Sequence, residues 1–495
     1  MQTMVPSRAR LATLLFGVAV AILASCARVE EAPSVADSID TLMSSLQDQG
    51  YFVSGAVVAG RDDEILYERG FGLANVAEGV PFTPDTPAHG ASMAKTLTAT
   101  AILMLDEEGR LRLDDPVTDY LPEFPYPEIE VRHLLDHSSG LLPEGPLLAL
   151  APRGEVHTNQ LLLDLLVEHA PPLAFTPGTG FLYSAGPVIA ATLVERVTGV
   201  SYASFLRERI FEPLEMDASF VRAAEAEESD RVRTLGYRRS PDGTLELFDE
   251  PANRHEYGGT GIDYSTRDLY RWVSSFYARP LLGESALRAG LEPPDLGEGQ
   301  RSGISLLNWY HSDGGRRFYF TGDSRGFYTF AYWDADRRHA FVYMSNTLLP
   351  NWLRPRLAMA LVDILEGRRP APGEDPGYGL AAVPASSWDL YAGLPSPNDF
   401  APVLGEYEME PAGRVTIENP PPNWLNVGWQ LRDGWFAPVV RVDGGLTLNM
   451  FPVEPGMFYV PCLDAWAGFT ESDGEPTLHW TQVFKGTSTG KRIVE

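Results

Sequence analysis

The sequence predicts an α+β fold, in which helices flank an antiparallel sheet and form a helical subdomain beside it, followed by a small all-β domain. Three observations predict this fold. β-Type runs occur near residue 55 and again near residue 330, and helical runs lie between them. Residues 401–495 contain only short β-type runs with turns between them. Terminal strands on either side of a helical stretch can share one sheet, which is an α+β arrangement.

The first 25 residues are predicted to be an export signal. Arg8 and Arg10 precede an apolar stretch over 11–23, which is too short to span a bilayer comfortably. The stretch ends in Leu-Ala-Ser-Cys, which resembles the lipobox of bacterial lipoproteins. This resemblance implies cleavage before Cys26, acylation of that cysteine, and a protein anchored by lipid to a bacterial membrane on its periplasmic or cell-surface side. The alternative is an ordinary cleaved signal in which Cys26 is incidental.

The main domain is expected over residues 38–366, after a polar tether over 26–37. It opens with a helix over about 38–49. The runs "FVSGAVVAG" and "EILYERGFG" then predict a hairpin of two strands over 52–72, because they are rich in β-branched and aromatic residues and are joined by a short polar turn. A proline-containing loop follows the hairpin.

The next helix begins at Ser92 and ends near Gly109, a plausible C-cap. It is apolar almost all round, which predicts a helix buried inside the protein. Further helices are expected at "NQLLLDLLVEHA" and "GPVIAATLVERVTG". Residues 318–346 then predict three short strands with turns at "GDSRG" and "DADRR".

The C-terminal part is expected to form a second unit. Residues 367–400 are rich in Pro, Gly, Ser and Ala and predict a linker, while 401–495 predict a small β-sandwich or barrel.

Charge and cysteine content limit the possible partners. The chain has 39 basic and 67 acidic residues, and its formal net charge is −28. Nucleic-acid binding requires basic surface, so no nucleic-acid partner is expected. The charge also disfavours anionic ligands unless a local basic patch reverses it. Acylation of Cys26 would leave Cys462 without a partner, so no structural disulfide is expected.

Lys95 is unusual because almost all the basic residues of the chain are arginines and only three are lysines. Residues three apart lie on one face of a helix, so Ser92 and Lys95 are predicted to touch. A serine hydroxyl becomes a nucleophile when a neighbouring base takes its proton. A buried lysine beside the positive end of a helix can act as that base, whereas arginine keeps its charge. The alternative is a helix N-cap with a solvent-facing lysine.

Three other patterns carry less weight. Ser488 and Lys491 have the same spacing, but they lie in a glycine-rich tail with no helix to align them. His133 and His137 are four residues apart, but no third ligand is evident, so neither a metal nor another cofactor is expected. "GASMA" is similar to a nucleophile elbow, but a proline loop precedes it where that motif needs a strand.

Four blocks in the order of the chain closely resemble the serine β-lactamase-like family, which includes class C β-lactamases, D-alanyl-D-alanine carboxypeptidases and related esterases. The blocks are "GASMAKTLTATAILMLDEEGRLRLDDPVTDYLPEF", "VRHLLDHSSGL", "FTPGTGFLYSAGPVIAATLVERVTGVSYASFLRERIFEPLEM" and "GGTGIDYSTRDL". The resemblance runs from about residue 40 to 350. It implies a β-lactamase/transpeptidase-like fold and a serine hydrolase that works through an acyl-enzyme. The tail resembles small β domains often fused behind this family.

The resemblance also assigns roles to residues. It implies Ser92 as the acylated nucleophile, Lys95 as its proton partner, and Tyr183 in "YSA" as the tyrosine that shares the proton transfers. The oxyanion hole would use the backbone N–H groups of Ser92 and Asp323.

The sequence departs from the family pattern at positions that are expected to bind the substrate. Ala185 stands where the family usually has asparagine, and Phe320 replaces the lysine or histidine before Thr321 and Gly322. Arg325, where the family often has proline, could restore a positive charge. The residues expected at the substrate are therefore Ala185, Phe320, Thr321, Gly322, Asp323 and Arg325.

These replacements remove the groups that hold a β-lactam or a peptidoglycan stem, and Phe320 is expected to add an apolar wall. The sequence therefore predicts an esterase-like hydrolase for small neutral acyl substrates. Two alternatives stay open: a catalytically idle, lipid-anchored binding or scaffold module, and a penicillin-binding carboxypeptidase or β-lactamase.

Overall fold

A computed structural model of the chain describes residues 33–62, 64–222, 234–240, 243–292, 295–297, 300–301, 306–307, 317–349 and 353–368, together with the strands of the C-terminal part. The predicted export signal, the lipid site at Cys26, the unpaired Cys462 and most of the predicted linker lie outside the described residues. Within the described residues, none of the helices combines the length and the hydropathy that crossing a bilayer requires.

The central sheet has five antiparallel strands in the order β12-β13-β14-β1-β2. The predicted hairpin and the predicted three strands are both present, and β1 pairs with β14 from Gly55↔Ser345 to Arg61↔His339. The sequence-based prediction that the two ends of the domain share one sheet is confirmed. The strands are β1 (Gly55–Arg61), β2 (Glu64–Phe71), β12 (Arg317–Ser324), β13 (Phe327–Asp334) and β14 (His339–Ser345).

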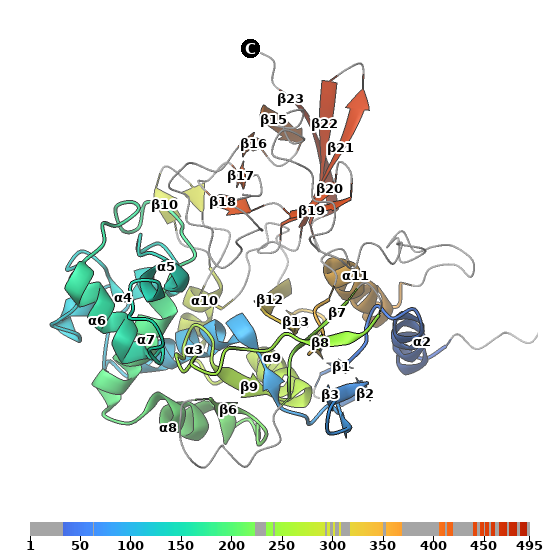
Figure 1. The fold of residues 1–495 in the computed structure, drawn as a ribbon, viewed down its shortest axis with the longest axis horizontal. Helices are drawn as coiled ribbons and strands as arrows, with labels where there is room; N and C mark the ends of the chain where they lie inside the picture. Colours follow the sequence, from blue (N-terminus) through green and yellow to red (C-terminus); the bar gives the residue numbers. More distant parts are fainter. Residues whose placement is uncertain are drawn as a thin grey trace, which may run out of the picture.

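Helices cover this sheet and form a separate region beside it (Figure 1). The flanking helices are α2 (Val35–Asp48), α9 (Thr266–Ala278), α10 (Glu284–Leu291) and α11 (Leu353–Leu365). α9 packs on β1, β13 and β14, whereas α2 and α11 pack on each other. The helical region consists of α4 (Val131–Leu135), α5 (Glu144–Leu148), α6 (Asn159–His169), α7 (Gly186–Thr198) and α8 (Tyr202–Leu206).

α3 (Ala94–Glu107) is the central helix of the domain, and every residue from Ala94 to Leu105 is buried. The chain leaves this helix through Gly109, whose φ of 65° is left-handed and suits a residue without a Cβ. The all-round apolar sequence therefore correctly predicted a buried helix. The predicted start at Ser92 falls in a 3-10 turn, η1 (Ala91–Met93), which leads directly into α3.

A small three-stranded sheet connects the segment before η1 to a distant loop. β5 (Ala88–His89) and β6 (Phe220–Val221) both pair with β9 (Ile262–Tyr264). The loop before β9 is thereby brought beside the start of α3. Such short strands carry no periodicity, and the sequence did not predict them.

The described C-terminal strands form one antiparallel sheet in the order β18-β17-β16-β15-β23-β22-β21-β20-β19 (Figure 1). The two ends of this order, β18 (Leu446–Asn449) and β19 (Phe451–Glu454), are separated in the sequence by residue 450 alone. The other strands are β15 (Gly405–Glu410), β16 (Gly413–Glu418), β17 (Val439–Val442), β20 (Met457–Val460), β21 (Ala465–Ser472), β22 (Glu475–Gln482) and β23 (Gly486–Arg492). The predicted domain boundaries stay predictions.

The second serine–lysine pair lies on one of these strands. Ser488 and Lys491 both lie in β23, so this pair is on a strand and not on a helix. The helical geometry that aligns Ser92 with Lys95 therefore does not apply to this pair.

Candidate active site

The turn that carries Ser92 is held in a narrow space. Its backbone begins at Ala91 with φ 49°, a left-handed value that is uncommon for a residue with a side chain. A Cβ on Gly90 would overlap the ring of Tyr264, and a Cβ on Gly322 of β12 would overlap the Gly90 carbonyl oxygen. Two glycines therefore let β12 and the small sheet approach the turn from both sides. Backbone strain of this kind persists only where the surroundings fix it, and it is common at functional sites.

Lys95 lies within reach of Ser92. Its Nζ is 3.4 Å from Ser92 Oγ and donates a hydrogen bond of 2.6 Å to the carbonyl oxygen of Gly259. The separation from Ser92 is at the long end of the hydrogen-bond range, as catalytic pairs often are before substrate binds. Lys95 is 8% exposed, so the alternative of a solvent-facing lysine does not hold.

Tyr183 completes this group from a different element. It lies just before α7, and its ring centroid is 4.8 Å from Nζ of Lys95. The ring of Tyr183 also stacks on the ring of His137, with 4.3 Å between the ring centroids and an interplanar angle of 28°. The structure thus brings together the three side chains that the sequence nominated for catalysis, Ser92, Lys95 and Tyr183.

Burial sets the protonation of the groups behind Tyr183. His137 is 1% exposed, and burial, helped by the charge of Lys95, lowers its pKa well below the usual value. Burial raises the pKa of the neighbouring Asp136 to about 6, against the hydrogen bonds that its carboxylate accepts from the Ser138 N–H and hydroxyl.

The two histidines that were weighed as metal ligands have other roles. His133 Nδ1 accepts a hydrogen bond from the Glu130 N–H, and burial lowers the His133 pKa to about 4. His137 Nδ1 accepts one from the Ser184 N–H. Across the part of the chain that the structure describes, no group of three His, Cys, Asp or Glu side chains is placed to hold a metal ion.

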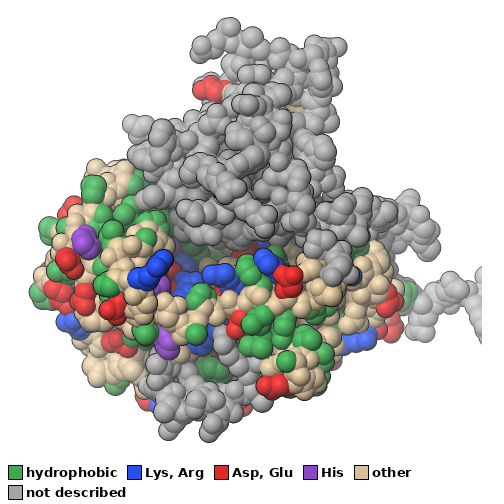
Figure 2. Space-filling model, viewed as in Figure 1, with side chains coloured by type: hydrophobic (Ala, Val, Ile, Leu, Met, Phe, Trp, Pro, Cys, Tyr) green, Lys and Arg blue, Asp and Glu red, His purple; other side chains and the backbone are tan. Residues whose placement is uncertain are grey.

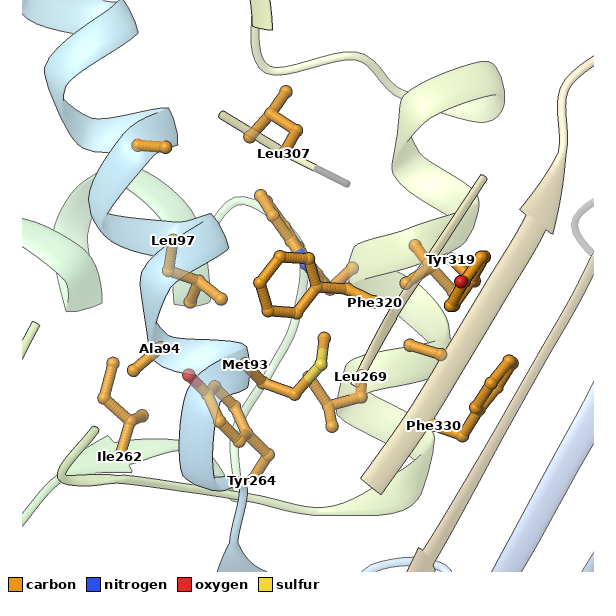
Figure 3. Packing of buried hydrophobic residues seen from close by; sticks show 14 of the residues in the cluster. Met93, Ala94, Leu97, Ile262, Tyr264, Leu269, Leu307, Tyr319, Phe320 and Phe330 are labelled. Atoms are coloured by element: carbon orange, nitrogen blue, oxygen red, sulfur yellow. The ribbon is translucent and has the colours of Figure 1, made fainter. Parts of the chain in front are cut away.

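The two positions that depart from the family pattern are both buried. Ala185 is the N-cap of α7, is 0% exposed, and has no side-chain polar group to offer. Phe320 is 1% exposed, and its ring points toward α3 beside Leu97 and Met93 (Figure 3). The expected apolar wall is therefore an internal packing surface beneath the nucleophile turn, because this face of β12 lies against η1 and α3.

The rest of this strand supports the turn with its backbone. Thr321 is 7% exposed, and Gly322 lies against Gly90. The carboxylate of Asp323 forms an ion pair of 2.5 Å with Arg354, at the start of α11. Arg354 is 1% exposed, and its guanidinium lies 4.2 Å from the ring centroid of Tyr328. The sequence singled out Asp323 for its backbone N–H but gave no sign of this partner.

Arg325 is exposed on the turn between β12 and β13, with φ 54°. Its guanidinium lies 5.4 Å from the ring centroid of Phe248. On the face of the molecule drawn in Figure 2, Lys and Arg side chains gather across the middle, between the helical region and the strands. The local charge there differs from the net charge of −28 for the whole chain.

A partly buried polar network lies next to Lys95. Arg254 makes ion pairs with three glutamates at 3.3, 3.4 and 2.5 Å, in the order Glu144, Glu250 and Glu256. A Cβ on Gly259, whose carbonyl accepts from Lys95, would overlap the carboxylate of Glu144. The network therefore borders the lysine. Its members are far apart in the sequence and belong to no local motif, so sequence reasoning missed them.

Burial and the ion pairs act in opposite directions on the pKa values of this network. Burial opposes the charge on Arg254, but the surrounding glutamates outweigh it and keep the pKa of Arg254 raised. Burial also raises the pKa of Glu256, against the attraction of Arg254. Glu250 accepts a hydrogen bond from Ser324 at the end of β12 and lies 3.8 Å from His89 Nδ1. The network thus connects β12 to the segment before the nucleophile turn.

The fold and the serine–lysine–tyrosine group define a serine hydrolase. The chain belongs to the beta-lactamase family, because the sequence model described as "Beta-lactamase" matches residues 39–366. The predicted family and the predicted β-lactamase/transpeptidase-like fold with a mixed α and β architecture are confirmed.

The relatives of this chain include a penicillin-binding protein, an esterase and a D-aminopeptidase. Penicillin-binding protein 4* of Bacillus subtilis (strain 168) is 28% identical over 450 residues, which cover 87% of this chain and 93% of that protein. Esterase EstB of Burkholderia gladioli is 34% identical over 209 residues, which cover 39% of this chain and 53% of the esterase. A D-aminopeptidase of Brucella canis is 30% identical over 309 residues, which cover 59% of this chain and 56% of that protein.

Solved structures resemble the fold. An octameric penicillin-binding protein homologue from Pyrococcus abyssi has a TM-score of 0.59 at 20% identity and covers 92% of this chain and 99% of its own. A class C beta-lactamase has a TM-score of 0.55 at 20% identity and covers 68% of this chain and 97% of its own. At this level of identity, the likeness concerns the fold.

Proposed function

We propose that the chain is an acyl-transferring hydrolase that forms an acyl-enzyme on Ser92 and acts on esters or other neutral acyl substrates. The observation that carries the proposal is the 3.4 Å approach of Lys95 Nζ to Ser92 Oγ, beside the ring of Tyr183. A nucleophile with a base in reach, and a third group that orients the base, is the arrangement that nucleophilic catalysis requires.

The proposed reaction has two halves. Ser92 Oγ attacks the acyl carbon while its proton passes to Lys95 or Tyr183, and the oxyanion is stabilised by backbone N–H groups of the turn and of β12. When the tetrahedral intermediate collapses, the bond to the leaving group breaks, and the same proton is delivered to that group. Water then attacks the acyl-enzyme and gives its proton to the same base, which releases the acid and restores the Ser92 hydroxyl.

The preference for neutral substrates is supported by the buried positions around the serine. Phe320 puts an aromatic ring where the family resemblance expects a cation, and Ala185 lacks the amide of asparagine. Arg254 belongs to the network that borders Lys95 through Gly259 and Glu144, but its guanidinium is already paired with glutamates. A substrate carboxylate would have to compete with these partners, whereas an uncharged ester would not.

A fluorophosphonate probe tests the nucleophile. Purified protein is expected to be labelled, and Ser92→Ala is expected to lose the label while keeping its thermal unfolding temperature. The preference is then measured as kcat/KM for short p-nitrophenyl esters against a chromogenic cephalosporin, with esters expected to be faster. Parent protein that takes up no probe would favour a binding or scaffold module, and faster cephalosporin turnover would contradict the neutral-substrate preference.

A penicillin-binding carboxypeptidase or β-lactamase is the second candidate. Two observations favour it: the similarity to penicillin-binding protein 4* over 93% of that protein, and the basic side chains on the face in Figure 2. Such a protein would be acylated by labelled penicillin with a lifetime of minutes or more, and Ser92→Ala would abolish this acylation. A hydrolase for neutral esters would not accumulate the penicilloyl adduct.

We also propose that the mature chain is held at a bacterial membrane by lipid on Cys26. The support is the apolar stretch over 11–23 followed by Leu-Ala-Ser-Cys. Metabolic labelling with an alkyne fatty acid is expected to modify the parent and not Cys26→Ser. Equal labelling of both proteins would contradict the anchor.

A further inference from the structure

His137 makes three contacts with Tyr183 and its two chain neighbours, although it lies far from them in the sequence. We propose that His137 is a positioning residue that holds Tyr183 in the orientation in which it shares a proton with Ser92 and Lys95. This inference rests on the proposed function, in which Tyr183 takes part in the proton transfers.

The backbone on both sides of Tyr183 is attached to His137. The N–H of Leu182 donates a hydrogen bond of 2.9 Å to the His137 carbonyl oxygen. The N–H of Ser184 donates one of 3.0 Å to His137 Nδ1. The residue before Tyr183 and the residue after it are therefore both fixed to the same partner, which restricts rotation of the intervening backbone.

The ring of Tyr183 is held by the same residue. It stacks on the His137 imidazole at 4.3 Å, and Nζ of Lys95 is 4.8 Å from the Tyr183 ring centroid. Phe181 adds an edge contact to the imidazole at 5.9 Å. Moving the phenol away from Lys95 would break the stack as well as strain the two backbone hydrogen bonds.

The contacts explain why this position suits histidine. The backbone of His137 has φ 60°, in the left-handed region. Apart from Gly, the residues enriched in this region are Asn, Asp and His. Asparagine would supply a hydrogen-bond acceptor and tolerate this backbone, but it has no ring. Phenylalanine would supply the ring but no acceptor. Histidine combines an acceptor with a flat ring, and acceptance at Nδ1 places the proton of the neutral imidazole on Nε2.

The arrangement requires a neutral imidazole. A protonated ring carries a hydrogen on Nδ1, which cannot accept from the Ser184 N–H. The groups that face the ring are Lys95 from α3, Tyr183 and Ser184 from the segment before α7, and its chain neighbour Asp136, whose carboxylate is bound to Ser138. Burial, followed by the charge of Lys95, lowers the His137 pKa, so the contacts persist well into the acid range.

The test is a double-mutant cycle on the full chain, with His137→Asn and Tyr183→Phe. In the parent background, His137→Asn is expected to lower kcat for ester hydrolysis about 100-fold, the loss that a small misplacement of a catalytic group can cause, with little change in KM. In the Tyr183→Phe background, the same substitution is expected to change kcat less than about twofold, because the group that it positions is already absent.

Further variants separate positioning from folding. His137→Phe keeps a flat ring but loses the acceptor at Nδ1, and is expected to lose about tenfold in kcat. His133→Asn, on the short helix α4 that precedes His137 and bonded to Glu130, is the matched control and is expected to leave kcat unchanged. Thermal unfolding of every variant is followed, and kcat is compared only among variants that unfold cooperatively. If His137→Asn does not fold, the same cycle is run with His137→Phe.

The outcomes distinguish this inference from the proposed function. Absence of Ser92-dependent fluorophosphonate labelling in the parent would overturn the function itself. A labelled, active parent in which the His137 substitution costs the same factor with and without the Tyr183 hydroxyl would overturn only the positioning role. An unchanged kcat in a folded His137 variant or in Tyr183→Phe would also overturn the positioning role, because the orientation of the Tyr183 hydroxyl would then not affect the reaction.

Discussion

The two sides of the site are built differently. On the helix side, Lys95 contacts Ser92 and the Gly259 carbonyl, and the ring of Tyr183 lies beside Lys95 and is stacked on His137. On the strand side, Phe320 is turned into the core, and the Asp323 carboxylate is bound to Arg354. The side chains able to move a proton thus come from the nucleophile turn, from α3 and from the segment before α7, and β12 contributes backbone and packing. Because recognition and proton transfer lie on different elements, one can change while the other is retained.

The largest effect that sharpens this contrast is expected at Lys95. Lys95→Met and Lys95→Arg are both expected to lower kcat/KM for ester hydrolysis about 1,000-fold, since general acid–base groups contribute on this scale. Arginine keeps a positive charge and hydrogen-bond donors, but it cannot release a proton under ordinary conditions. The comparison of the two variants therefore isolates proton transfer from charge.

Lys491→Met is the matched control for this experiment. It removes the lysine of the other serine–lysine pair, which lies on β23 rather than on a helix. Its kcat/KM is expected to equal that of the parent. Activity retained in Lys95→Arg would mean that the helix side needs only a charge at this position, and the proposed proton transfer would then be wrong.

The helix side was predicted from the sequence because its geometry is local. The spacing of Ser92 and Lys95 brings them together by helical geometry, and the 3-10 turn that precedes α3 did not disturb this. Burial of α3 also followed from its all-round apolar sequence. Tyr183 was located only through the family resemblance, since nothing in its own surroundings in the sequence connects it to α3.

Non-local contacts were out of reach of the same reasoning. Arg354 follows Asp323 by 31 residues and belongs to another element, so no spacing rule connects them. His137 was weighed as a metal ligand because it is four residues from His133, a spacing that aligns side chains on a helix. α4 ends at Leu135, and the left-handed backbone of His137 takes its ring to Tyr183 instead.

Strand pairing shows the same division. The hairpin β1–β2 and the strands β12 to β14 follow from short β-type runs and their turns. The pairing of β15 with β23 in the C-terminal sheet joins segments from its two ends. Register between such distant strands depends on side-chain packing across the sheet, which a single sequence does not display.

The second largest effect is expected on the strand side, in stability. Arg354→Met would leave the carboxylate of Asp323 without its buried partner and is expected to lower the free energy of unfolding by about 3 kcal/mol. Urea denaturation of the full chain measures it. Adding Asp323→Asn removes the uncompensated charge, so the double variant is expected to be more stable than Arg354→Met alone. A double variant no more stable than the single one would show that the ion pair does not brace β12.

The smallest effect tests whether recognition can be restored without touching the helix side. Phe320→His returns a residue that can carry charge to β12, and it is expected to shift the ratio of kcat/KM for a chromogenic cephalosporin over a p-nitrophenyl ester about tenfold toward the cephalosporin. One hydrogen bond to a charged group accounts for a change of this size. The gain should grow as the pH falls below the ordinary imidazole range, because burial at this position lowers the pKa of the introduced ring and only the protonated ring attracts a carboxylate. Phe320→Leu, which loses the ring without adding charge, is the control. An equal shift in both variants would trace the change to repacking beneath the nucleophile turn, and charge on β12 would then have no part in choosing the substrate.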